Sequence, residues 1–265
     1  ETLSVYGTIH ATGPKAAISG NGDAKYNNGN TSISIYEGAQ VDAATGYAIY
    51  HPQAGSLRIS GGQISGPGGI QMCAGKLEIS GSPTITATGT ADTTKTENDG
   101  VVYDAAAISV VNRSYPGGVP TVVINGMPVV TANGETIHAY TWSGGHESTW
   151  SEAGKQINVN GGSYSKQFDL SYLLEGSTFE TVGSRYEVRP AQVVEIDGVI
   201  YSYLRNAIAG DYRGKTIKLL SNVTISDGNI SLGGKYHGDA TTLDLNGHTL
   251  SFANGTQLDI TGGGT

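Results

Sequence analysis

The sequence is poor in charged and bulky residues. Its 265 residues include one cysteine, two tryptophans and three phenylalanines, and 14% are charged, against roughly 25% in ordinary globular chains. The lone Cys73 excludes an intramolecular disulfide and a cysteine-based metal cluster, and we expect it to be a small buried or half-buried thiol. Scarce charge also argues against disorder, which favours high net charge. The expected core is therefore thin, built from Val, Ile, Leu and Ala.

Basic clusters and long apolar runs are lacking as well. The net charge is −8, and no cluster of Lys and Arg is present for binding nucleic acid or an anionic membrane surface. No run of about 18 apolar residues exists, so we expect no membrane insertion. The chain begins at Glu1 without Met and ends at GGGT. We interpret it as part of a longer polypeptide, from which a signal peptide could have been removed.

Glycine is abundant, at 40 residues, and much of it belongs to one repeated pattern. The pattern is apolar, any, apolar, polar, Gly, and then an apolar residue a few places later. The period of two predicts a short strand with one buried face, and the Gly ends that strand in a bend. The clearest copies are LRISGGQI from Leu57, LEISGSPTI from Leu77, VVINGMPV from Val122, INVNGGSY from Ile157 and LDLNGHTL from Leu243, with LDITGGG beginning another at Leu258.

The spacing between copies predicts the architecture. By subtraction, copies starting at Ile33, Leu57, Leu77, Val122 and Ile157 lie 24, 20, 45 and 35 residues apart. Repeats of this length are typical of solenoids, propellers and arrays, and steps near twenty suit one coil of three short strands. The longer steps require loop excursions. We therefore predict an all-β chain folded as a right-handed parallel β-helix, a solenoid with long excursions; the alternative is an antiparallel β-sandwich.

The pattern divides the chain into three parts. Residues 1–162 are predicted to form the parallel β-helix. Residues 163–190 contain many bulky side chains and no Gly-bend copy, and we expect them to cap the last coil. In residues 191–265, Asp197-Gly198 predicts a hairpin, which a short helix and further copies follow. This last part is predicted to begin a second, truncated β-helix unit.

The order of motifs in the second half resembles that of a known group. VEIDGVIY, a short helix, GKTIKLLSNVT and LDLNGHTL follow one another, and GGSYSKQFDLSYLLEGSTFETV precedes them. Over residues 157–265, and at repeat level over 1–156, this order is similar to that of pectate-lyase-like right-handed β-helix repeat proteins of the cell surface of Gram-positive gut anaerobes. The resemblance implies export, wall attachment through parts absent here, and tandem modules. It supplies no catalytic residues.

Candidate catalytic groups are sparse. Asp99 and Asp104 flank the excursion TATGTADTTKTENDGVVYDA, with Glu97 close by. Asp244 and Asp259 occupy equivalent positions of two copies, and we expect them one coil apart on the outer face. Neither set brings the Arg and Lys that a polysaccharide lyase uses, and no Gly-x-Ser-x-Gly elbow is present. We therefore predict no catalytic residues, no metal site and no cofactor.

Both tryptophans and two of the six histidines lie in one segment, HAYTWSGGHESTW. The step from Val122 to Ile157 is 15 residues longer than the shortest step (35 − 20), so the surplus is expected to leave the coil as a loop. Loops on a rigid scaffold often bind ligands, and aromatic residues give large contact area with little loss of rotamer freedom. Alternatively, the two indole rings fold back and plug one side of the solenoid. The predicted ligand-binding residues are Trp142, Trp150, Tyr140, His138 and His146, with Tyr103 and Tyr115 on the same flank if the copies stack in register.

These observations favour a non-catalytic module of the bacterial cell surface, monomeric within a longer extracellular chain. The expected partner is a host macromolecule: a glycan, a mucin-like glycoprotein or an immunoglobulin. Two alternatives remain, a glycan-cleaving β-helix enzyme (a polysaccharide lyase or a glycoside hydrolase) and a structural stalk. No nucleic-acid partner is expected.

Overall fold

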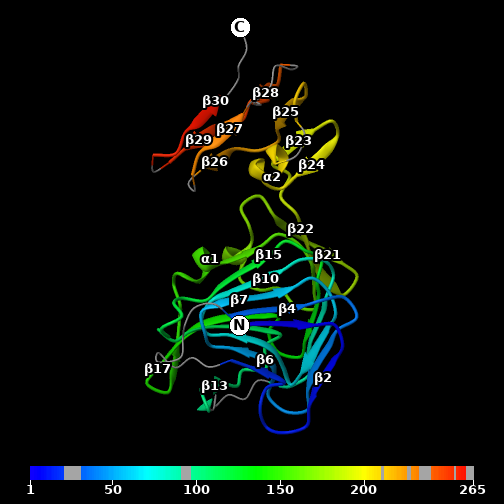
Figure 1. Ribbon diagram of the computed structural model, residues 1–265, viewed down its shortest axis with the longest axis vertical. Coiled ribbons are helices and arrows are strands. Elements are labelled where there is room, and N and C mark those ends of the chain that lie inside the picture. The colour runs from blue at the N-terminus through cyan, green and yellow to red at the C-terminus, as the bar shows by residue number, and fades with distance from the viewer. Residues whose placement is uncertain are drawn as a thin grey trace. The chain divides into compact units, whose positions relative to one another are not determined.

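The computed structural model of the chain (Figure 1) divides into two compact units. The first unit comprises residues 1–174 and 178–189, and the second comprises residues 175–177 and 190–265. Among the described residues, no helix is long and apolar enough to cross a membrane. The residues that the structure describes are 1–20, 31–90, 97–209, 212–225, 228–232, 240–253 and 255–260.

Unit 1 is built from three sheets in which strands of successive coils pair in parallel. The chain adds one strand to each sheet in turn, an arrangement that fits a β-solenoid. The antiparallel sandwich is therefore wrong for the repeated strands.

Sheet A contains β1 (Thr2–Val5), β4 (Thr31–Ile35), β7 (Gly55–Ile59), β10 (Lys76–Ile79), β15 (Thr121–Ile124) and β19 (Ile157–Val159). Sheet B contains β2 (Thr8–Ala11), β5 (Gln40–Ala43), β8 (Gln63–Gly66), β11 (Thr84–Ala87), β16 (Val129–Ala132), β20 (Ser163–Tyr164), β22 (Arg185–Arg189) and β21 (Thr178–Val182). Sheet C contains β3 (Ile18–Ser19), β6 (Tyr47–His51), β9 (Gly68–Met72), β14 (Ile108–Asn112), β17 (Ile137–Ser143) and β18 (His146–Ser148).

The apolar positions of the repeat form columns inside unit 1. Leu57, Leu77, Val122 and Ile157 stand in register on sheet A, and all four are fully buried. Burial of one residue in two along each strand follows from the alternation of side chains across a strand. The prediction that the copies stack in parallel register is thereby confirmed.

The Gly of the bend is required where two coils come closest. Gly81 has a φ of +63°, and a Cβ atom there would lie 2.0 Å from the backbone oxygen of Ser60 in the preceding coil. We expect Gly81→Ala to lower the free energy of unfolding by more than the about 1–3 kcal/mol that the strained backbone alone costs, because the new methyl group would also clash with the preceding coil. Gly38→Ala is the control, since Gly38 has a φ of +82° but open space at its Cβ position. Urea unfolding compares the two, and equal losses would contradict the close-approach role.

Sheet C differs from the other sheets because both faces of its central strands are buried. All residues of β6 and β9 are buried, whereas β7 and β10 alternate between buried and more exposed positions. In the excursion between β11 and β14, Glu97, Val102 and Asp104 contact the outer face of sheet C. The excursion contains a short antiparallel hairpin of β12 (Glu97–Asn98) and β13 (Val101–Val102). A polar and aromatic layer is thus held outside the solenoid core on this one side.

The last coil of unit 1 is followed by short helices and antiparallel strands. Helix α1 (Ala153–Gln156) precedes β19, and it contacts the 3-10 helix η1 (Leu170–Tyr172). Strand β22 pairs antiparallel with both β20 and β21, so sheet B ends in antiparallel strands. Phe168 packs edge-on against Tyr164 and Phe179, with ring centres 4.9 and 4.8 Å apart. All of these strands and rings after β19 belong to the predicted cap, residues 163–190.

Unit 2 has a separate core and repeats the parallel pairing. The predicted hairpin forms at Asp197-Gly198, which have φ angles of +52° and +79°.

Asp244 and Asp259 lie on different sheets, so the expectation that they sit one coil apart is wrong. The reason is that LDLNGHTL and LDITGGG contribute strands to different sheets. The elements are β23 (Val194–Ile196), β24 (Val199–Tyr201), α2 (Leu204–Ile208), which is the predicted short helix, β25 (Thr216–Leu219), β26 (Val223–Ile225), β27 (Ile230–Leu232), β28 (Thr242–Asp244), β29 (Leu250–Phe252) and β30 (Leu258–Ile260).

Candidate binding groove

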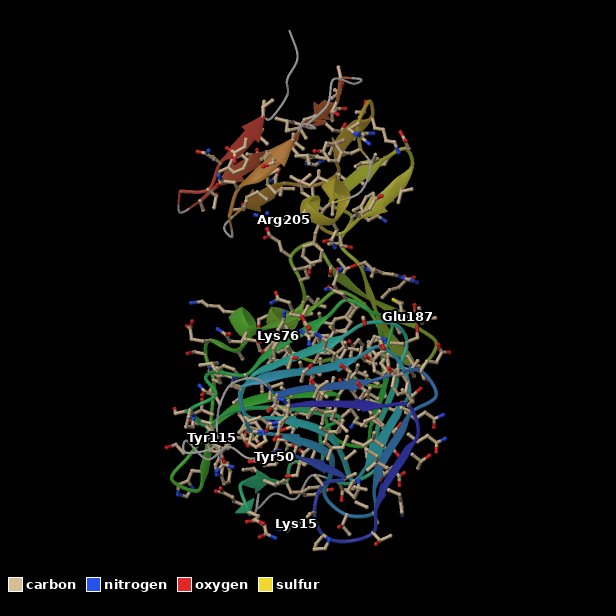
Figure 2. The ribbon with its side chains drawn as sticks, in the orientation of Figure 1. Lys15, Tyr50, Lys76, Tyr115, Glu187 and Arg205 are labelled. Atoms are coloured by element: carbon tan, nitrogen blue, oxygen red, sulfur yellow. The ribbon has the colours of Figure 1, made fainter. Side chains whose placement is uncertain are left out.

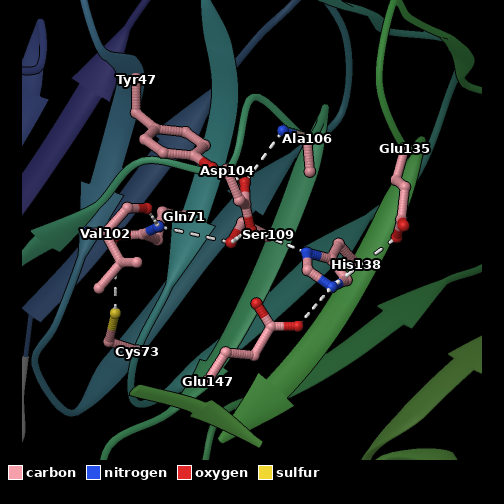
Figure 3. Close-up of polar contacts among 10 residues, drawn as sticks. All are labelled: Tyr47, Gln71, Cys73, Val102, Asp104, Ala106, Ser109, Glu135, His138 and Glu147. Carbon is pink, nitrogen blue, oxygen red and sulfur yellow. Dashed lines mark hydrogen bonds and ion pairs between the residues drawn. The ribbon is translucent and has the colours of Figure 1, made fainter. Parts of the chain in front are cut away.

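A buried carboxylate organises the outer face of sheet C (Figure 3). Asp104, near the end of the excursion, is 3% exposed. Its Oδ1 accepts hydrogen bonds from the Tyr47 hydroxyl and the Ala106 N–H (2.9 Å), and its Oδ2 accepts one from the Ser109 hydroxyl (2.7 Å). The same Oδ2 lies 3.1 Å from Nδ1 of His138 on β17. One side chain therefore joins the excursion to three strands of sheet C.

These contacts keep Asp104 ionised in spite of its burial. Burial by itself raises the pKa of this carboxyl group. The hydrogen bond and charge of His138, together with the hydrogen bonds from Tyr47 and Ala106, outweigh that effect and hold the pKa of Asp104 below its usual value. Burial and the nearby Asp104 charge raise the pKa of the Tyr47 phenol, which therefore stays protonated as a donor.

His138 links this network to the hairpin that follows it. Its Nε2 lies 3.3 Å from an oxygen of Glu147 on β18 and 3.9 Å from an oxygen of Glu135. Residues 137–141 pair in register with β14, and β18 then turns back antiparallel onto β17. The expectation of a loop is therefore wrong for this segment, because its first half simply extends the parallel sheet.

The network does not have the geometry of a nucleophilic triad. Ser109 is fully buried and donates to Asp104, whereas a triad requires the serine to donate to histidine. Among the residues that the structure describes, no group of three or more His, Cys, Asp or Glu is placed to hold a metal ion. Cys73 is fully buried as expected, and burial raises the pKa of its thiol to about 12. A thiol of that pKa is protonated at neutral pH and is a weak nucleophile.

Trp142 belongs to a second apolar cluster, the outer cluster, which lies between sheet C and the excursion. Its indole is 6% exposed and donates to Oε2 of Glu97 at 2.8 Å. Glu97 also pairs with Arg113, whose guanidinium lies 5.1 Å from the ring centre of Tyr115. Tyr115 and Tyr50 lie side by side (Figure 2), with hydroxyl oxygens 3.5 Å apart. The buried members of the outer cluster are Tyr50, Cys73, Val102, Val111, Tyr140 and Trp142.

A groove of about 510 Å³ opens beside the β17–β18 hairpin, and the rest of its lining comes from residues 149–151, from α1, and from η1 with its N-cap. Its aromatic lining consists of Tyr140, Trp150 and Tyr172, which are 1%, 8% and 7% exposed. Glu147 and Asp169 add two carboxylates. Hydroxyl groups are contributed by Ser148, Thr149, Ser151 and Ser171.

Both carboxylates of the groove are held in place by contacts within the protein. Glu147 is paired with His138, and its side chain is 34% exposed. Asp169 is the N-cap of η1 and accepts the backbone N–H of Ser171 at 2.9 Å. Anchored side chains lose less freedom when a ligand binds. The groove is therefore largely pre-formed.

The structure brings the predicted tryptophans to one flank and covers both of their rings. Tyr140 and Trp150 line the groove. His138 does not line it but pairs with the lining residue Glu147. Trp142 lies in the outer cluster instead. The burial of both indoles matches the alternative in which the rings pack against the solenoid.

The remaining predicted residues lie apart from the groove. Tyr115 packs on the outer cluster, so the segment that carries it does share the flank with Trp142. Tyr103 contacts Tyr47 edge-on and lines a second groove of about 410 Å³. His146 is exposed at the turn of the hairpin.

Sequence reasoning missed the cap side of the groove. Asp169, Ser171 and Tyr172 come from a segment that carries no repeat, so the coil pattern could not place them near Trp150. A local signal was nevertheless present in Asp169 itself, because an Asp side chain often caps a turn by accepting the backbone N–H two residues on. The position of Asp104 in the network also lacked a local signal, since its partners come from three different strands.

Comparison of the chain with protein-family models, with curated proteins and with solved structures gives no match. The groove and its surroundings are therefore the basis of the proposed function.

Proposed function

We propose that this chain is a non-catalytic binding module, in which a right-handed parallel β-helix presents the groove to a carbohydrate ligand. The observation that carries the proposal is the combination of aromatic side chains, two carboxylates and several hydroxyls in the lining of one groove of about 510 Å³. Binding sites typically combine apolar walls with a few convergent polar groups. The C–H groups of a sugar ring can pack against the apolar walls, and its hydroxyls can bond to the polar groups. Ionised carboxylates accept hydrogen bonds from such hydroxyls.

The anchoring of the carboxylates supports binding rather than catalysis. Glu147 faces His138, and Asp169 caps η1, so both have structural roles in the groove walls. A glycoside hydrolase needs one carboxyl group as general acid and a second as base or nucleophile on either side of the bond. Rigid groove walls instead favour affinity, because little freedom remains to be lost.

We also propose that the module acts outside the cell, on the surface of a Gram-positive bacterium, and that the ligand belongs to a host glycoprotein. The motif order that resembles surface β-helix repeat proteins supports this location. Low cysteine content is compatible with it, since such proteins often dispense with disulfides. An immunoglobulin bound through its protein surface is the main competing partner.

A steric block of the groove tests the proposal. Thr149 lines the groove and is exposed, so Thr149→Trp should fill the groove without disturbing the core. We expect at least about a tenfold loss of affinity for glycan-bearing mucin-type glycoprotein, measured by biolayer interferometry, because the ligand would lose its central contacts. Thr8→Trp on β2 is the matched control, since Thr8 is exposed and lies outside the groove lining.

The outcomes separate the competing functions. Equal binding by both variants would contradict a ligand site in this groove. Capture of immunoglobulin that persists after enzymatic deglycosylation would favour protein recognition. Release of reducing ends or unsaturated sugars from the glycans would favour the enzyme alternative.

A further inference from the structure

The charge of the groove distinguishes between classes of sugar. Among the described residues that line it, Glu147 and Asp169 are the only carboxylates, and no Lys, Arg or His is present. Lys155 lies on α1, next to groove residue Gly154, but it is ion-paired with Glu152. The lining therefore carries two negative charges and no positive one.

The groups behind the lining add to the negative potential. His138 is surrounded by Asp104, Glu135 and Glu147 (Figure 3), so this cluster has a net charge of −2 (three carboxylates minus one imidazolium) even when the imidazole is protonated. The Tyr172 phenol experiences the same field. Burial first, and then the charges of Asp169 and Glu135, raise the pKa of Tyr172 to about 12.

We infer that the groove selects uncharged sugars and rejects acidic ones, such as sialylated, sulfated or uronic-acid sugars. Carboxylates of the protein accept hydrogen bonds from neutral hydroxyls, but they repel the negative charge of an acidic sugar. Like charges placed together across an interface are a common source of specificity. This inference rests on the proposed function, because it identifies the ligand class of the same groove.

Matched glycans test the inference. The probes are a sialylated mucin-type glycoprotein and the same glycoprotein after sialidase treatment, titrated against the whole chain by biolayer interferometry. We expect the neutral form to bind about tenfold or more tightly, since like-charge contacts oppose the acidic one. Added salt should narrow the difference by screening.

A neutralised groove provides the second arm of the test. The double variant Glu147→Gln, Asp169→Asn keeps an acceptor for His138 and for the Ser171 N–H while removing both charges. We expect its preference for the neutral glycoprotein to fall to about twofold or less. Stronger binding of the sialylated form by the unmodified chain, or an unchanged preference in the variant, would overturn the inference. If the unmodified chain binds neither form, nor other glycans, the proposed function itself fails.

Discussion

Replacement of Asp104 by Ala is expected to lower the free energy of unfolding by about 3–5 kcal/mol, as is typical when one partner of a buried charged network is removed. The variant would leave the Tyr47 and Ser109 hydroxyls, the Ala106 N–H and His138 without their shared acceptor. Buried donors without acceptors are costly because they have also lost water. Urea unfolding at neutral pH, followed by circular dichroism, measures the loss.

An exposed pair of the same residue types is the control for this prediction. His10 and Asp42 form an ion pair with side chains 52% and 32% exposed. Asp42→Ala should therefore cost less than about 1 kcal/mol, since exposed ion pairs contribute little. Similar losses for Asp104→Ala and Asp42→Ala would show that the buried network does not hold the excursion in place.

The Asp104 network also predicts a direction for the pH dependence of stability. The pKa of Asp104 is lower in the folded protein than its ordinary value, because His138 and the other donors outweigh the effect of burial. Its stabilisation is therefore fully present above the pKa of an unfolded Asp, about 3.9, and is lost as the pH falls through the folded-state value. We expect the difference in stability between the unmodified chain and Asp104→Ala to shrink in that acidic range.

The second large effect is expected at Trp142. Trp142→Ala should lower the free energy of unfolding by about 3–5 kcal/mol, because a large buried ring is replaced by a cavity. Trp142→Phe keeps much of the ring packing in the outer cluster and loses the hydrogen bond to Glu97, which is worth about 1.5–3 kcal/mol for a charged acceptor. Thermal and urea unfolding of both variants should therefore give a graded series.

His146→Ala provides the comparison within the same hairpin, because His146 is exposed at its turn. We expect its effect to stay within about 0.5 kcal/mol, as for most surface substitutions. A Trp142→Ala variant as stable as His146→Ala would mean that the indole is not part of the packed flank and would restore its role as a ligand contact.

The periodic part of the fold could be predicted from sequence because each coil repeats the same local physics. Leu57, Leu77 and Val122 occupy equivalent positions of the Gly-bend pattern, and they stack in the structure. Asp197-Gly198 likewise predicted its hairpin, because a turn of this kind is determined by adjacent residues.

The candidate site could be predicted only in part. Trp150 and Tyr140 were expected at a ligand site from their residue types, and they line the groove. Its other wall comes from Asp169 and Tyr172, which no repeat position relates to the hairpin. The hairpin itself was expected as a loop, since a count of surplus residues does not reveal that β17 continues the sheet. Contacts between segments without periodicity depend on tertiary packing, which the sequence pattern does not encode.

The groove is lined by two segments of chain on either side of β19 and β20, the hairpin before these strands and η1 after them. A sugar bound in the groove would consequently contact both segments and link the hairpin to η1 at the end of the solenoid. Detachment of η1 would require the ligand to leave, so occupancy should stabilise that end of the solenoid by an amount that grows logarithmically with ligand concentration relative to Kd. Under a pulling force, such a module would resist extension best while it is attached to its target.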